Sequence, residues 1–170
     1  KVAFIGELAL KPRISGGGSS HINAYKVESI LSAAEKYHVN YARGYDLEKN
    51  DPDAALEEEA VHLAEKSDVA VLFVGLPDRY ESEGFDRLSL DLPENHNALI
   101  EKIAEVQKNI VVVLQNGAPV LMPWLNKVKA VLELYLGGQA VGGAAIRLLY
   151  GEVNPSGRLA ETFPARMEDT

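Results

Sequence analysis

Two glutamates that lie two residues apart are the first candidates for chemistry in this chain. Glu81 and Glu83 belong to the segment YESEGFDRLSLDLP, residues 80–93, where Gly84 permits a tight turn. The neighbouring Asp86 and Arg87 could form an ion pair that fixes the shape of the loop. A carboxyl group held in a cleft wall can have a raised pKa and act as a general acid. One such group is half of a hydrolytic mechanism, and a solvated acidic loop is the simpler alternative.

The position of this loop favours a role in a functional site. It follows VAVLFVG, residues 69–75, a run so apolar that it predicts a buried strand. Open α/β sheets bind ligands at loops that follow the C-terminal ends of their parallel strands. A catalytic acid is therefore a hypothesis that the location supports and does not establish.

A glycine-rich segment, RISGGGSSHIN at residues 13–23, is the second candidate site loop. Backbone N–H groups of glycines can approach an anion closely, and the hydroxyls of Ser19 and Ser20 could face a polar ligand. The segment lacks both the Gly-Lys-Ser/Thr ending of a Walker loop and a G-x-G-x-x-G pattern after the first strand. A flexible loop without a ligand is the alternative.

The four histidines are scattered, without the spacing of metal ligands, so we expect no metal site. Only His21, in the glycine-rich segment, is a candidate to face a ligand. His38 is expected at a helix end, and His62 and His96 at solvated helix positions. The chain also lacks a G-x-S-x-G elbow, which leaves a serine hydrolase without a nucleophile.

Composition excludes several classes of function. The 170 residues suffice for one domain with a core, and 46% hydrophobic with 25% charged residues is typical of a globular protein. A formal net charge of -8 argues against nucleic acid or an anionic membrane as partner. The absence of cysteine excludes disulfides, thiolate catalysis and Cys-ligated metals, and we expect no cofactor. The lack of a signal-peptide pattern favours a cytoplasmic over a secreted location, although the cysteine content leaves the compartment open.

Apolar runs alternate with helix-length amphipathic segments along the chain. This alternation predicts βαβ units, and hence one α/β domain with a doubly wound, mostly parallel sheet and helices on both faces. An additional edge strand is expected at residues 159–163, after a turn-rich segment. The predicted strands are residues 2–5, 39–42, 69–75, 110–114 and 130–135, and the predicted helices are 25–37, 53–66, 94–106 and 139–150.

The order of motifs resembles the α/β-sandwich domain of glycoside hydrolase family 3, the β-glucosidase family. The resemblance extends from residue 1 to about residue 164, and the last motif together with the ESEGFDR segment makes it specific. The matching motifs are KVAFIG, GGGSS, SDVAVLFVGL, ESEGFDR with LDLP, IVVVLQNGAPVLMPW and GEVNPSGRLAETFP.

The resemblance implies a retaining glycosidase, which uses two carboxylates. In this family the acid/base is a glutamate in the loop that ESEGFDR matches, and Glu83 fits it best, with Glu81 as the fallback. Ser19 would contact the β-glucoside or oligosaccharide substrate, and Asp86 and Arg87 would support the loop. The nucleophile would be an aspartate on a separate (β/α)8 barrel domain, with the active site between the two domains.

No segment of these 170 residues matches that barrel. We therefore expect residues 1–170 to be a single α/β-sandwich domain whose intramolecular partner is the barrel, and which hydrolyses almost nothing alone. Two rival hypotheses remain: a non-catalytic module that binds a carbohydrate or a partner, and a flavodoxin-like nucleotide-binding domain. The missing phosphate fingerprint weakens the second rival.

Overall fold

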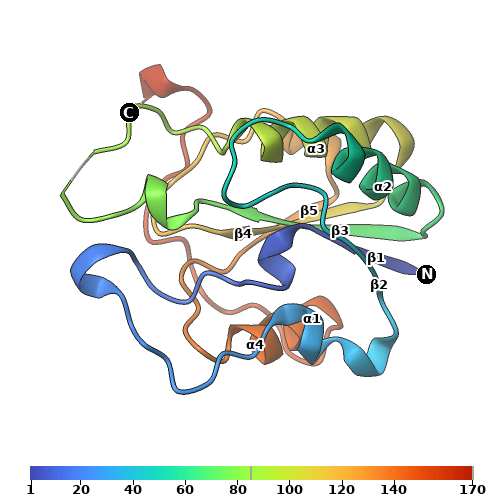
Figure 1. The fold of residues 1–170 in the computed structure, drawn as a ribbon, viewed down its shortest axis with the longest axis horizontal. Helices are drawn as coiled ribbons and strands as arrows, with labels where there is room; N and C mark the ends of the chain where they lie inside the picture. The colour runs from blue at the N-terminus through green and yellow to red at the C-terminus, as the bar shows by residue number, and fades with distance from the viewer. Residues whose placement is uncertain (85, 170) are drawn as a thin grey trace.

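In the computed structural model, which describes residues 1–84 and 86–169, five parallel strands form one sheet in the order β2-β1-β3-β4-β5 (Figure 1). Every pair of neighbouring strands is parallel, which confirms the predicted α/β fold. The central strand β3 is buried on both faces, and this explains its uninterrupted apolar sequence. The strands are β1 (Val2–Ile5), β2 (Asn40–Ala42), β3 (Val69–Gly75), β4 (Ile110–Gln115) and β5 (Ala130–Glu133).

Helices cover both faces of this sheet. Figure 1 shows α2 (Ala54–Glu65) and α3 (Glu94–Val106) packed on one face, and α1 (Ile30–Ala33) and α4 (Val141–Leu149) on the other. Two hydrophobic clusters, one rich in residues of α3 and the other containing residues of α1 and α4, fill the layers between helices and sheet. All strands thus direct their C-terminal ends to one edge of the molecule, where the candidate loops emerge.

The first helix is shorter than the predicted span of residues 25–37. Its N-cap is Ser29, whose hydroxyl accepts a hydrogen bond from the Ser32 amide, and the preceding Glu28 amide donates to the Gln139 carbonyl. This contact with a distant segment holds the chain before Ser29 outside the helix. After α1 the chain continues as a short 3-10 helix that ends at His38, in left-handed conformation, so the prediction for this histidine is confirmed.

Two predictions at the C-terminal side are wrong. β5 ends at Glu133 rather than at residue 135, because Tyr135 has a φ of 50°, which an extended strand cannot contain. The described residues 154–164 form no strand, so the expected edge strand at 159–163 is absent. The Ala160 amide donates to the Tyr135 hydroxyl instead of to a carbonyl of β5, so no ladder forms there.

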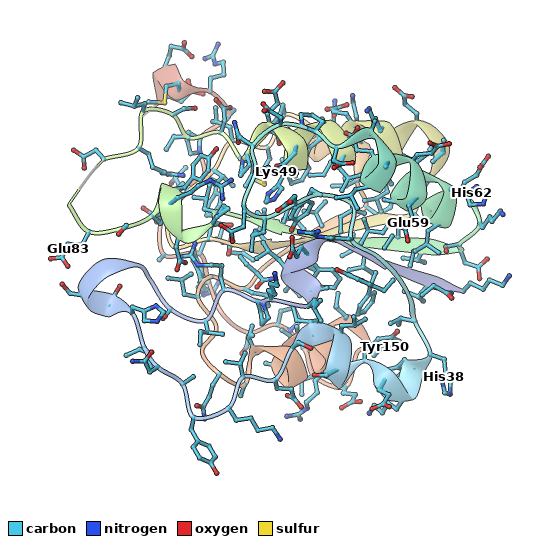
Figure 2. The ribbon with its side chains drawn as sticks, in the orientation of Figure 1. His38, Lys49, Glu59, His62, Glu83 and Tyr150 are labelled. Carbon is cyan, nitrogen blue, oxygen red and sulfur yellow. The ribbon has the colours of Figure 1, made fainter. Side chains whose placement is uncertain are left out.

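His96 is the one histidine whose predicted environment is wrong. It lies in the first turn of α3, 1% exposed, with its ring centroid 3.9 Å from that of Tyr45. Its Nδ1 atom accepts a hydrogen bond of 3.4 Å from the Gly75 amide at the end of β3. Burial, followed by the nearby charge of Arg79, lowers the pKa of His96 to about 3. His62, by contrast, is exposed as predicted, and Figure 2 shows it at the opposite end of the molecule from Glu83.

No helix among residues 1–84 and 86–169 is long and apolar enough to cross a membrane.

Because the pKa of His96 is lower in the folded than in the unfolded chain, the unfolded state binds more protons as pH falls below about 6.5. We expect acid to destabilise the protein partly through this residue. In His96→Gln, the decrease in urea midpoint between about pH 7 and pH 4.5 should be smaller than in the wild type. The exposed His62→Gln variant should behave as wild type, and an unchanged pH dependence in His96→Gln would contradict this prediction.

Candidate functional site

Three segments meet at the C-terminal edge of the sheet. They are the glycine loop after β1 (residues 13–20), the acidic loop after β3 (residues 80–84 and 86–87) and the platform turn after β4 (residues 116–119). Figure 1 shows the blue glycine loop beside the green acidic loop at this edge. Together with Leu136, the three segments line an open cavity of about 590 Å³.

Glu81 fastens the acidic loop to the platform turn. Its carboxylate accepts hydrogen bonds from the amide of Gly117, at 2.8 and 3.0 Å, and from that of Ala118, at 2.8 Å. The guanidinium of Arg13 lies 3.6 Å from the same carboxylate, whose side chain is only 12% exposed. Glu81 is therefore occupied as an acceptor, and it has a structural role.

Arg87 fastens the other end of the acidic loop to the same turn. Its Nη2 atom donates a hydrogen bond of 2.8 Å to the Pro119 carbonyl. The expected ion pair between Asp86 and Arg87 is not among the ion pairs of the described residues, so this prediction is wrong. The guanidinium is turned toward the platform turn, while Asp86 remains exposed and lines the cavity.

Arg13 is a buried organiser that the sequence interpretation missed. It is 6% exposed, its Nη1 donates to the Leu76 carbonyl, and its Nε lies 3.0 Å from an oxygen of Asp78. Its backbone amide donates to the side chain of Gln115, which is fully buried at the end of β4. An arginine at the start of a glycine-rich segment was the only available signal, and its partners come from strands far away in sequence.

Glu83 is more exposed than Glu81, and its hydrogen-bond partner comes from the glycine loop instead of the platform turn. It is exposed at the tip of the acidic loop, and Figure 2 shows it at the outer edge of the molecule. Both the hydroxyl and the amide of Ser19 donate to its Oε2 atom, the amide at 3.0 Å. These hydrogen bonds lower the pKa of Glu83, so the raised pKa expected of a general acid is not found at this residue in the domain by itself.

The glycine loop can approach the acidic loop closely because two positions of the contact are glycines, and a side chain at either position would collide with the acidic loop. A Cβ atom on Gly17 would lie 2.9 Å from the Glu81 carbonyl oxygen, and one on Gly18 would lie 2.7 Å from the Cβ of Glu83. Gly18 also has a φ of 66°, which disfavours other residues. The loop thus holds Ser19 against Glu83, and the amides of Gly17 and Ser19 are paired with the acidic loop.

The remaining predicted residues of the glycine loop lie near this contact. Ser20 lines the cavity, and its hydroxyl donates to the Gly17 carbonyl at 3.0 Å, which stabilises the loop. His21 follows as an exposed residue, and its amide donates to the Gly18 carbonyl. Contact of Ser19 or Ser20 with a substrate stays a prediction. Among the described residues, no group of three or more His, Asp and Glu side chains could hold a metal ion.

A third carboxyl group near the platform turn was also missed. Glu133, the last residue of β5, is half-buried, and burial raises its pKa to about 7, with a further contribution from the charge of Glu81. Strand order explains the omission: β4 and β5 are neighbours, so the residues that end them lie close together. A glutamate that ends an apolar strand was the signal available.

Comparison with known proteins identifies the family. The model of the glycosyl hydrolase family 3 C-terminal domain matches residues 1–170. The chain belongs to glycosyl hydrolase family 3. It is 56% identical to the thermostable beta-glucosidase B of Acetivibrio thermocellus, over 98% of this chain and 23% of that protein.

Two further relatives cover nearly all of this family 3 domain. The exo-alpha-(1->6)-L-arabinopyranosidase of Bifidobacterium longum is 44% identical over 99% of the chain and 23% of that protein. The crystal structure of the GH3 beta-glucosidase of Bifidobacterium adolescentis superposes with a TM-score of 0.94 at 44% identity, over 99% of this chain and 25% of that chain. The family 3 domain thus spans about a quarter of the length of these relatives.

The two glutamates of this domain should respond differently to truncation. Glu81→Ala removes the acceptor of two amides in the platform turn, so it should lower the free energy of unfolding by about 1 to 3 kcal/mol. Glu83→Ala removes an exposed carboxylate and should change this free energy by less than about 0.5 kcal/mol. Urea unfolding at neutral pH measures both values, and equal losses in the two variants would contradict the assigned roles.

Proposed function

We propose that this domain supplies the general acid/base, Glu83, and one wall of the active-site cleft of a retaining β-glucosidase that hydrolyses terminal β-D-glucosides. The observation that carries the proposal is the division of roles between the two glutamates. Glu81 is bound to the amides of Gly117 and Ala118, whereas Glu83 lies at an open cavity and, among the described residues, is held by Ser19 alone. Of this pair, Glu83 is the carboxyl group free to meet a substrate.

The relatives support the substrate class. The first relative is named a beta-glucosidase, and it is 56% identical over nearly the whole domain. The B. longum relative is named for an α-L-arabinopyranoside, so this sugar is the second candidate. A comparison of p-nitrophenyl β-D-glucoside with p-nitrophenyl α-L-arabinopyranoside on the intact parent protein decides between them, and the proposal expects faster hydrolysis of the glucoside.

The lowered pKa of Glu83 is compatible with this role once the cavity is covered. A general acid must hold a proton at working pH, and an exposed carboxylate beside Ser19 does not. A second domain and a bound sugar would exclude water from Glu83, and loss of hydration raises the pKa of a carboxyl group. The hydrogen bonds from Ser19 would then orient the carboxyl group, and Ser19 and Ser20 would lie close enough to contact the sugar.

A retaining mechanism needs a second carboxylate about 5 to 5.5 Å from the first, on the opposite side of the glycosidic bond. Glu81 cannot supply it, because it belongs to the same loop and its oxygens are bound to the platform turn. We assign the nucleophile to an aspartate of a (β/α)8 barrel domain in the parent protein. The 170-residue chain alone should therefore not hydrolyse an aryl β-glucoside, and full turnover by this chain would overturn the assignment.

In the intact parent protein, Glu83→Gln should slow hydrolysis of glucosides with poor leaving groups by about 10²- to 10⁴-fold, because the departing oxygen then receives no proton. Dinitrophenyl glucosides, whose leaving group needs no proton, should lose much less. Values of kcat/KM across a series of aryl glucosides, which report the step in which the leaving group departs, measure this dependence. The exposed Glu105→Gln variant, on α3, serves as the control and should retain wild-type rates.

A loss in Glu83→Gln that is equal for all leaving groups would contradict the proton-transfer role. Unchanged rates together with unchanged sugar binding would instead support a non-catalytic carbohydrate-binding module.

A further inference from the structure

Asn116, the first residue of the platform turn, and Glu133, the last residue of β5, form a hydrogen-bonded pair. The Nδ2 atom of Asn116 donates to Glu133 Oε2 at 3.1 Å and to the Ala118 carbonyl at 3.0 Å. The other oxygen of Glu133, Oε1, accepts a hydrogen bond of 2.6 Å from the Tyr135 amide. Both Glu133 oxygens therefore face donors, as an ionised carboxylate requires.

The other half of the Asn116 amide has no such partner. Its Oδ1 atom is buried and accepts no hydrogen bond from the described residues. A buried acceptor without a donor is costly, so a donor placed beside Oδ1 would stabilise this site.

Protonation of Glu133 changes the hydrogen bond that its carboxyl group favours with the Asn116 side chain. A proton on Oε2 weakens this oxygen as an acceptor for the Asn116 N–H and makes it a donor, which can pair with Oδ1 after the amide rotates by about 180°. The rotation also turns Oδ1 toward the Ala118 carbonyl, where two acceptors repel each other. The Ala118 carbonyl must then move, and the amide of the same residue, in the preceding peptide unit, is one of the donors that hold Glu81.

We infer that Glu133 and Asn116 are a proton-responsive support of the platform turn, and that ionised Glu133 holds this turn in the position that fastens the acidic loop. Glu133 is a positioning residue, since it acts on Glu83 only through Asn116, the platform turn and Glu81. Its effect on catalysis rests on the proposed function of Glu83, whereas the support itself does not.

The surroundings of Glu133 place this change near neutral pH. Burial raises its pKa to about 7, the charge of Glu81 acts in the same direction, and the hydrogen bonds from Tyr135 and Asn116 oppose it. Glu133 lines a groove together with Arg147 of α4 and Arg158 of the C-terminal segment. No ion pair within the described residues includes Glu133.

The direct test is a pH titration of this chain followed by two-dimensional ¹H–¹⁵N NMR. We expect the amide signals of Gly117 and Ala118 to shift with a midpoint near pH 7, the pKa of Glu133. This step should be lost in Glu133→Gln and kept in Glu58→Gln, which changes an exposed glutamate of α2. Amide signals that do not shift near pH 7, or a step that persists in Glu133→Gln, would overturn the inference.

A second variant guards against a folding defect in Glu133→Gln. In Asn116→Ala the carboxyl carbon of residue 133 should still titrate near neutral pH, while the step in the Gly117 amide is lost. A Gly117 step of wild-type size in Asn116→Ala would show that Asn116 does not transmit the change, and it would overturn the inference.

The parent protein tests the catalytic consequence. Because protonation releases the platform turn, kcat/KM should fall on the acid side of about pH 7, and Glu133→Gln should lose this limb of the profile. A profile unchanged by Glu133→Gln would overturn the coupling to Glu83. The proposed function fails by a different result, namely wild-type activity in Glu83→Gln, and the NMR titration would stand in that case.

Discussion

The carboxylate of Glu81, bound to the two amides of the platform turn, is the interaction on which the candidate site depends. The turn is fixed by β4, and β4 lies between β3 and β5 in the sheet. Glu81 is therefore anchored next to an inner strand of the sheet, and Glu83 is only two residues away. Arg87 repeats this attachment on the far side of Glu83 through the Pro119 carbonyl. The exposed Glu83 thus gains a defined position from its two bound neighbours.

Close approach of the glycine loop completes this arrangement. Side chains at Gly17 or Gly18 would collide with the acidic loop, so only glycines let Ser19 reach Glu83. Arg13 links the start of the same loop to Glu81 through a buried guanidinium. The two loops therefore hold each other through these contacts.

Much of the fold could be predicted from local sequence, and the details of the site could not. The uninterrupted apolar run of β3 and the amphipathic pattern of α3 are local signals, and both elements lie where they were expected. The role of Glu81 depends on β4, which lies more than 25 residues further along the chain. The prediction for His96 was wrong because it also depended on distant residues. A polar histidine in a helix is expected to be exposed, but this side chain contacts Gly75 and Tyr45.

The most direct test is a crystal structure of the intact parent protein with an unhydrolysed substrate analogue, such as a thioglucoside, in which the distance from Glu83 to the glycosidic heteroatom is measured. The account predicts Glu83 within hydrogen-bond range of that atom, about 2.6 to 3.2 Å for an oxygen and slightly longer for sulfur, with Glu81 still bound to the platform turn. A structure with Glu81 released and directed at the glycosidic atom, or with Glu83 directed into solvent, would contradict it.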